Sequence, residues 1–211
     1  MVGDADQLPS VGPGNILGEI LKAGVVPTVR LTDIFRQAQR SLIVQNAHRI
    51  VEGQMPQKGG PKDDFFLIES NGLACQKLVC DLVSTRLPKA YGFDPVRDIQ
   101  VLCPTKLGPT GTQALNVELQ NLLNPEQKGK PQLQSASRVF RVGDKVMQVR
   151  NNYEIVWNRI GGEQGVGAYN GDIGIVESIN MRDRSMVVRM DDRRLLYPAE
   201  NLNLSLIHIS E

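Results

Sequence analysis

The chain has 211 residues, 41% hydrophobic and 22% charged, a composition that excludes both an intrinsically disordered and a membrane-embedded chain. Its 24 Lys and Arg nearly balance 23 Asp and Glu, which excludes a histone-like basic protein and an acidic tail protein. No stretch approaches the roughly 18 apolar residues that span a bilayer, and no signal segment opens the chain. Three cysteines without CxxC spacing predict buried, reduced thiols in a cytoplasmic protein.

The first third of the chain predicts the end of a strand, a turn-rich loop and three short helices. Met1-Val2 before Gly3-Asp4 is typical of a buried strand that runs into a loop, and several Gly and Pro residues follow. Helices are predicted from Ile16 to near Gly24, over 31–39 with Thr32 as N-cap, and over 41–51 with Gly53 as the stop.

The middle of the chain alternates predicted strands with predicted helices. Phe65–Ile68 and Ile99–Cys103 are short apolar runs that indicate buried strands. Helices are predicted over about 72–87, where Pro88 enforces the end, and over about 112–123. This alternation indicates βαβ units on a parallel sheet.

After Pro125 the pattern changes to short alternating runs separated by polar turns. Asn170-Gly171 and Asp191-Asp192 supply turn chemistry between them. The spacing predicts a small antiparallel barrel. Its predicted strands are Arg138–Arg141, Lys145–Val149, Ile173–Ile179, Met186–Met190 and Leu195–Tyr197.

One basic stretch lies in this otherwise neutral chain. Residues 128–160 hold seven Lys and Arg against two acids, whereas residues 163–200 hold five Arg against seven acids. A contact with a polyanion would require such a stretch, and a solvated basic face explains it equally well.

The most specific string is Gly3 to Gly14, which reads Gly-Asp-Ala-Asp-Gln-Leu-Pro-Ser-Val-Gly-Pro-Gly. It places carboxylates and the Gln7 amide at the carboxyl edge of a strand, where open α/β sheets bind ligands. An amide can orient a water or a phosphate oxygen without adding a charge of its own. A Gly/Pro turn capped by Asp is the plainer interpretation of the same composition.

This string closely resembles motif III of superfamily 1 DNA helicases of the RecD-like, 5′-to-3′ branch, which includes exodeoxyribonuclease V alpha-subunit-like proteins. Residues 31–37 resemble the following motif IV, and residues 41–50 continue it. Residues 101–116 resemble the next block of the family. Residues 140–148 with 169–174 are similar to its SH3-like insertion, so the resemblance runs to about Asn203.

The resemblance implies an α/β fold, a partial RecA-like P-loop NTPase domain built on a parallel sheet, together with a small all-β SH3-like barrel. It implies the edge of the first RecA-like domain over 1–30 and most of the second over 31–134. The barrel would occupy 135–204, and the tail at 205–211 does not match the family.

The resemblance also implies roles for two residues at the nucleotide. Gln7 would sense the γ-phosphate and pass its state to bound single-stranded DNA. Arg36 would act as an arginine finger that stabilises charge on the transferring phosphoryl group, although the pattern alone favours a surface arginine on a helix. Asp4, Asp6 and His48 receive no role. ATP and Mg²⁺ are the implied cofactors, with the Mg²⁺ ligands outside this sequence.

Two regions are predicted to contact DNA. Lys106, Thr110 and Thr112 lie in a loop before a helix N-terminus, where side chains and backbone amides suit a phosphate, although an ordinary βα loop remains the alternative. In the basic stretch, Arg141, Lys145 and Arg150 would hold single-stranded DNA. Three aromatic side chains would stack on bases or belong to the barrel core: Tyr153, Trp157 and Tyr169.

No phosphate loop of the form GxxxxGK occurs, because Asn124 stands where Gly129-Lys130 would require the first glycine. We therefore expect a fragment of an ATP-driven DNA helicase that does not hydrolyse ATP alone. Single-stranded and duplex DNA, and subunits of a recombination nuclease, are the expected partners, with no membrane. The alternative is a stand-alone module that binds nucleic acid or a partner without a motor.

Overall fold

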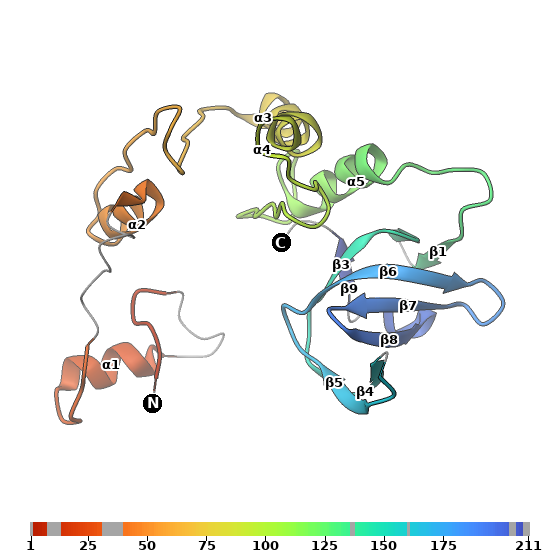
Figure 1. The fold of residues 1–211 in the computed structure, drawn as a ribbon. Helices are drawn as coiled ribbons and strands as arrows, with labels where there is room; N and C mark the ends of the chain where they lie inside the picture. The colour runs from red at the N-terminus through yellow and green to blue at the C-terminus, as the bar shows by residue number, and fades with distance from the viewer. Residues whose placement is uncertain are drawn as a thin grey trace. The chain divides into compact units, whose positions relative to one another are not determined.

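The computed structural model describes residues 2–7, 14–30, 40–135, 138–159, 161–202 and, for the backbone, 206–208. The chain divides into two compact units, residues 1–69 and 70–211, each of which is described by itself. Figure 1 shows the elements in chain order.

The first unit contains two short helices with well-formed caps. Helix α1 (Ile16–Ala23) begins where the Asn15 side chain accepts from the Gly18 amide at 3.0 Å, and it ends at Gly24 with φ of 64°. Helix α2 (Leu42–Val51) begins at Ser41, whose Oγ accepts from the Val44 amide at 3.3 Å. Both predicted helices are confirmed, because local capping signals specify these ends. The helix predicted over 31–39 lies outside the described residues.

The strand predicted at Phe65–Ile68 is wrong. These residues carry no strand pairing, and Phe66, Leu67 and Ile68 are exposed. A strand needs a partner's backbone groups, and an apolar run alone supplies none. The segment instead follows a loop that is bonded to α2, where Asn46 and Gln57 exchange two hydrogen bonds of 3.0 and 2.7 Å.

The helical part of the second unit contains one long interrupted helix followed by α5. Helix α3 (Gly72–Asp81) continues into a π-helical turn, η2 (Leu82–Arg86), and then α4 (Leu87–Tyr91). The prediction that Pro88 ends the helix is wrong, because the helix continues through Pro88 to Tyr91, with the proline directly after the π-helical turn. The Leu87 amide reaches back to Leu82 O, which is the wider spacing of a π-turn.

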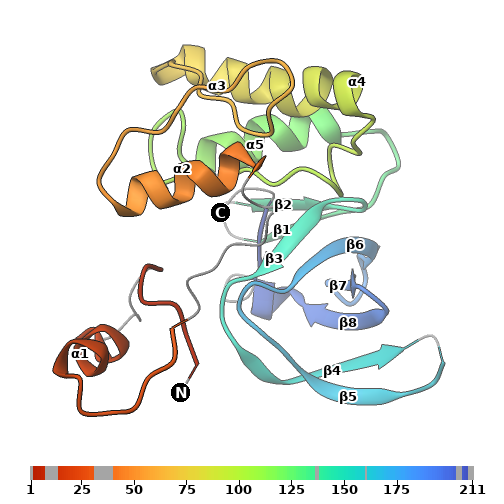
Figure 2. The ribbon, with the colours of Figure 1, turned by 60° about the vertical axis from the view of Figure 1, so that its left-hand side comes forward.

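Helix α5 (Thr112–Leu123) matches its predicted range. It packs with the α3–η2 segment around a small cluster of Cys80, Val83, Ile99, Leu115 and Leu119 (Figure 2). The strand predicted at Ile99–Cys103 is reduced to a single bridge at Val101, so the described residues form no parallel sheet.

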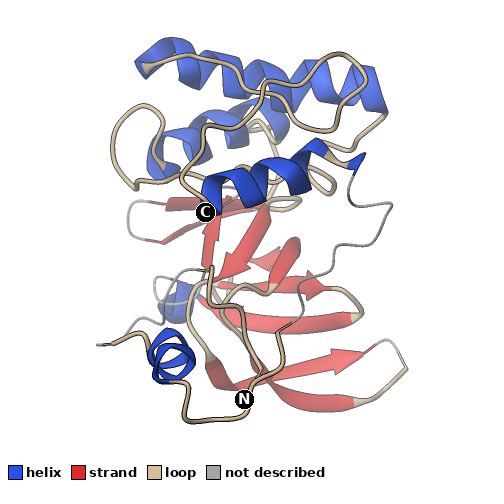
Figure 3. Cartoon of the chain, turned by 90° about the vertical axis from the view of Figure 1, so that its left-hand side faces the viewer, coloured by secondary structure: helices blue, strands red, loops and turns tan. Residues whose placement is uncertain are grey.

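All strand pairs in the second unit are antiparallel. Strands β1 (Gln132–Ser135) and β2 (Arg138–Arg141) form a two-stranded ribbon. A seven-stranded sheet follows in the order β5-β4-β8-β7-β6-β3-β9, drawn in red in Figure 3. Its strands are β3 (Lys145–Gln148), β4 (Asn152–Arg159), β5 (Gln164–Ala168), β6 (Ile173–Asn180), β7 (Ser185–Met190), β8 (Arg193–Pro198) and β9 (Leu206–His208), with a 3-10 turn, η3 (Ala199–Asn201), before β9.

The five predicted strands are confirmed, although Arg138–Arg141 pairs with β1 in the separate ribbon, and β1, β4, β5 and β9 were not predicted. The predicted turns at Asn170-Gly171 and Asp191-Asp192 are present, with φ of 93° at Gly171 and 52° at Asp191. The curled sheet encloses one core. That core consists of Leu133, Phe140, Val146, Ile155, Ala168, Val176, Met186, Val188, Met190, Leu195, Tyr197 and Leu202.

Candidate nucleic-acid interface

The loop that carries Gln7 is held by Asp4. One carboxylate oxygen of Asp4 accepts from the Asp6 amide at 3.0 Å, and the other accepts from Gln7 Nε2 at 3.1 Å. All three side chains are exposed. Asp4 therefore orients the Gln7 amide. Arg36, the other residue predicted at the nucleotide, lies outside the described residues.

The loop before α5 is folded onto the helix N-terminus. The amides of Thr112 and Gln113 donate to the carbonyls of Thr105 and Lys106, at 3.1 and 3.2 Å. A Cβ at Gly111 would lie 2.5 Å from Leu107 O, so this close approach requires glycine. The amides of Thr112 and Gln113 therefore already have acceptors within the loop. The exposed Lys106 and the half-buried Thr110 and Thr112 side chains stay predicted contacts.

Two of the residues predicted to bind DNA are buried. Arg141 is 8% exposed, and its Nη1 donates to Asn124 O at 3.1 Å, at the C-terminus of α5. Lys145 is 6% exposed, and its Nζ donates to Ile99 O at 2.9 Å. Burial lowers the pKa of Lys145, while the nearby Asp94 and Asp98 carboxylates oppose that shift. We therefore withdraw both residues from the predicted DNA surface.

Asp144 connects α5 to the barrel through buried hydrogen bonds. Its carboxylate accepts from Gln120 Nε2 and Asn124 Nδ2, both at 2.6 Å, and from the Arg141 amide at 2.7 Å. Asp144 itself is 1% exposed. A buried carboxylate needs such donors, so these hydrogen bonds join the C-terminal end of α5 to the barrel.

Most of the basic residues in this stretch bind partners within the protein. Besides Arg141 and Lys145, Lys130 donates to Asn124 Oδ1, and Arg159 forms ion pairs with Glu163 and Asp192. The local positive charge therefore does not form one continuous cationic face. Arg150 is exposed at one end of the barrel.

The aromatic residues of the stretch fall into two groups. Trp157 packs against the barrel core, with the Arg159 guanidinium 5.2 Å from its ring centroid, and a Cβ at Gly165 would lie 2.3 Å from the ring. Trp157 therefore has a structural position. Tyr153 and Tyr169 are 64% and 48% exposed and form an edge-to-face pair with centroids 6.0 Å apart.

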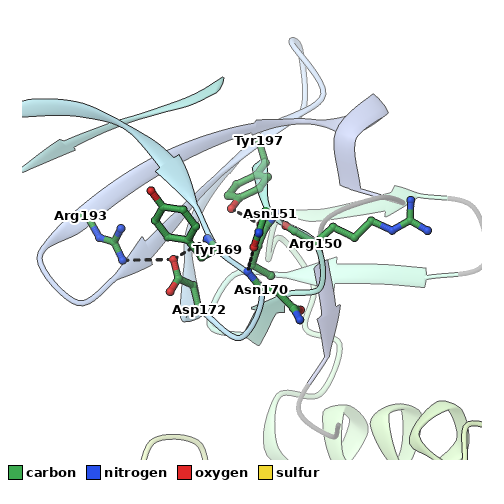
Figure 4. A network of polar contacts seen from close by, with 8 residues as sticks. Arg150, Asn151, Tyr169, Asn170, Asp172, Arg193 and Tyr197 are labelled. Carbon is green, nitrogen blue, oxygen red and sulfur yellow. Dashed lines mark hydrogen bonds and ion pairs between the residues drawn. The ribbon is translucent and has the colours of Figure 1, made fainter. Parts of the chain in front are cut away.

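Sequence reasoning missed the residues that hold this end of the barrel. Gln148, Asn151 and Tyr197 join the two loops that carry Arg150 and Tyr169, as Figure 4 shows for the labelled residues. Burial raises the pKa of the Tyr197 phenol, which donates to Gln148 Oε1 at 2.8 Å. No local motif marks Gln148, because its partners come from three separate strands and loops.

In the described part of the chain, no three His, Cys, Asp or Glu side chains gather as metal ligands would. Nor does any described helix have the length and apolar character needed to cross a membrane.

Fold and site define a helical segment joined by a buried polar network to a small antiparallel barrel. The comparisons assign this class to a family. Residues 115–190 match the SH3 domain of ATP-dependent RecD-like DNA helicases, a range that includes most of α5, and residues 1–64 match an AAA domain. These matches confirm the predicted fold class, an α/β segment with a small SH3-like barrel, and the described residues themselves form no parallel sheet.

The ATP-dependent RecD2 DNA helicase of Deinococcus radiodurans is 35% identical over 176 residues, which cover 83% of this chain and 21% of that protein. The chain belongs to the RecD-like DNA helicase family and spans about a fifth of the length of this curated relative. The predicted resemblance is thereby confirmed.

Proposed function

We propose that the chain works as part of a longer helicase that uses ATP to translocate on single-stranded DNA and unwind duplex DNA. The observation that carries this proposal is the match of α5 and the barrel to the RecD-like SH3 domain. The name of the Deinococcus relative, an ATP-dependent DNA helicase, supports it. A cytoplasmic location and a role in DNA repair or recombination belong to the same proposal.

At the nucleotide, Gln7 would sense the γ-phosphate and Arg36 would supply the arginine finger. The Asp4–Gln7 hydrogen bond supports a positioned amide at Gln7. The chain has no phosphate loop, and its described residues offer no Mg²⁺ ligand group, so we assign those parts of the ATP site to other segments of the longer protein. ATP and Mg²⁺ would be bound there.

The proposed DNA contacts are Lys106, Thr110, Thr112 and Arg150. These side chains lie on the loop before α5 and at one end of the barrel. Because α5 is bonded to the barrel through Asp144, both contacts belong to one connected part of the unit. We propose the boundaries 1–30, 31–134 and 135–204 for the two RecA-like portions and the barrel.

The test of the nucleotide site uses a full-length parent protein. Arg36→Ala should abolish ATP turnover and leave nucleotide binding largely intact, because an arginine finger acts on the transition state. Arg40→Ala, four residues further on, is the matched control, and this variant should hydrolyse ATP at the normal rate. Near-normal turnover of Arg36→Ala would remove Arg36 from this role.

The 211-residue chain provides the second test. It should show no measurable ATP hydrolysis and weak, salt-sensitive binding of single-stranded DNA. DNA-stimulated hydrolysis by the purified chain would overturn the assignment of the phosphate loop to another segment. A phosphate loop encoded in frame upstream of this sequence would favour the helicase over a stand-alone binding module.

A further inference from the structure

Two exposed tyrosines meet at one end of the barrel. Tyr153 is the second residue of β4 and Tyr169 follows β5, and their rings lie at 72° with centroids 6.0 Å apart. Their exposed fractions, 64% and 48%, leave much of both rings in solvent. Aromatic rings are normally buried for most of their area, so an exposed pair is a candidate binding surface.

Both rings are held in place by the backbone and by neighbouring side chains. Asn151 Nδ2 donates to the Tyr153 hydroxyl at 2.9 Å, and the Tyr169 amide donates to Asp172 Oδ2 at 3.0 Å. A Cβ at Gly167 would lie 3.0 Å from the Tyr169 hydroxyl oxygen, so this ring lies directly over the Gly167 backbone. Gly167 has φ of 105°, which a residue with a side chain rarely adopts.

One buried residue, Gln148, ties together the two loops that carry the pair. Its Nε2 donates to Arg150 O at 2.6 Å, and its Oε1 accepts from the Tyr197 hydroxyl at 2.8 Å. Its backbone exchanges bonds of 2.8 Å with Gly171 and Asp172. Gln148 is 0% exposed. The loops are thereby ordered before any ligand arrives, which lowers the entropic cost of binding.

The chemistry of this end favours a planar ligand with a negative charge beside it. Two rings at 72° offer flat ring faces rather than the parallel walls of a groove for a proline-rich peptide. The Arg150 side chain is exposed and points away from Tyr169 (Figure 4). The Asp172 carboxylate is offset by Arg193, 3.5 Å away.

We infer that Tyr153 and Tyr169 form a stacking site for one unpaired base of a single-stranded nucleic acid, with Arg150 contacting the phosphate of a neighbouring nucleotide. The inference rests on the proposed function and assigns a specific ligand element to the barrel end. Stacking on these rings tolerates any base, because every base has a π-face.

The experiment compares two oligonucleotides of equal length and charge, oligo-dT and its fully abasic analogue, by anisotropy with the 211-residue protein. Stacking predicts that oligo-dT binds about 5- to 150-fold more tightly. Tyr153→Ala and Tyr169→Ala should each reduce this preference severalfold, whereas Tyr153→Phe should keep it because the ring remains. Circular dichroism checks that each variant is folded.

A matched control uses a second exposed aromatic pair among the described residues of the second unit. Tyr91 is 55% exposed and stacks on Phe93 with centroids 5.4 Å apart, so Tyr91→Ala should leave the preference for oligo-dT unchanged. Arg150→Ala should weaken the binding of both oligonucleotides equally and should lower the slope of log affinity against log salt concentration by about 1.

Salt-sensitive binding without a preference for oligo-dT would overturn the stacking site and leave the proposed DNA contacts standing. A preference that survives in folded Tyr153→Ala and Tyr169→Ala would overturn it equally. Absence of binding to either oligonucleotide at low salt would overturn the proposed DNA-binding role of this chain as well. If the protein shows no preference for oligo-dT and a proline-rich peptide binds the tyrosine pair, the ligand of this pair is a peptide and not a base.

Discussion

The two units of the chain contrast in how they are stabilised. In the described part of residues 1–69, Asn46 is the one buried side chain, and apolar residues such as Ile16, Ile43, Ile50 and Val51 are more than half exposed. In residues 70–211, the barrel alone has a core of twelve buried residues. Residues 1–64 match an AAA domain and residues 115–190 match the RecD-like SH3 domain, yet among the described residues the barrel alone encloses a large core with its own strands.

The contrast shows that helix formation and core formation depend on different information. Helices α1 and α2 begin and end through caps made by residues within or near the helix. Burial of their apolar faces needs another layer of structure. In the barrel sheet, β4–β5, β6–β7 and β7–β8 pair as sequence neighbours, whereas the β3–β6, β4–β8 and β3–β9 pairs join strands that are distant in sequence and close the sheet around the core.

The largest expected effect concerns adjacent leucines in β8. Leu195 is 0% exposed and Leu196 is 55% exposed, so they form a matched pair. Leu195→Ala should lower the free energy of unfolding by about 2–5 kcal/mol, because it leaves a cavity in the core. Leu196→Ala should change it by less than about 0.5 kcal/mol. Fluorescence of Trp157, the one tryptophan of the chain, reports barrel unfolding during denaturant titration. Equal losses in the two variants would contradict the described core.

A smaller loss is expected where α5 meets the barrel. Asp144→Ala removes the acceptor for Gln120, Asn124 and the Arg141 amide. Unsatisfied buried donors should lower the free energy of unfolding by about 2–3 kcal/mol. Glu118→Ala, an exposed position on α5, is the control and should have little effect. Hydrogen exchange should increase at the C-terminal end of α5 in Asp144→Ala, and unchanged exchange there would contradict the connection.

The smallest expected effect is confined to the first unit. Asp64 accepts from Ser41 Oγ at 2.5 Å and from the amides of Leu42 and Ile43, and the Ser41 bond contributes most to lowering the pKa of Asp64. Asp64→Ala should speed amide exchange in the first turn of α2 and leave the barrel transition unchanged. Glu69→Ala, an exposed carboxylate paired with Lys58, should leave α2 exchange unchanged.

The same cap has a defined pH dependence. Because folding lowers the pKa of Asp64, its contribution is complete above the unfolded value of about 3.9 and is lost as pH falls through the folded value. The protection of the first turn of α2, measured relative to the intrinsic exchange rate at each pH, should therefore fall at acid pH in the wild type. In Asp64→Ala this acid-dependent loss of protection should be missing, and an identical loss in both proteins would contradict the cap.

Local sequence signals predicted α1, α2 and α5 and five barrel strands, because caps, turns and alternation act over a few residues. The same reasoning failed at Phe65–Ile68 and Ile99–Cys103, where the apolar runs lack the neighbouring strands that a sheet requires. It also failed at Pro88, since the helix continues past the proline after a π-helical turn. The β4–β5 hairpin was missed, and its register shifts at an irregularity between Asn152 and Val156.

The candidate site shows a comparable division. A sequence count of charges treats Arg141, Lys145 and Arg150 alike, although two of them are buried by partners from distant segments. The count could not distinguish them, because burial depends on which elements pack together. The aromatic candidates divided in the same way, with Trp157 packed against the core and Tyr153 and Tyr169 exposed.

The sequence by itself determined the family, through ordered motifs, and the helix and strand identities that local backbone preferences specify. The tertiary structure alone decided which charges and rings reach solvent. That difference arises because a motif is a property of neighbours along the chain, whereas exposure depends on contacts between residues far apart in sequence. Gln148, which binds both loops at the barrel end, has its role only through such contacts.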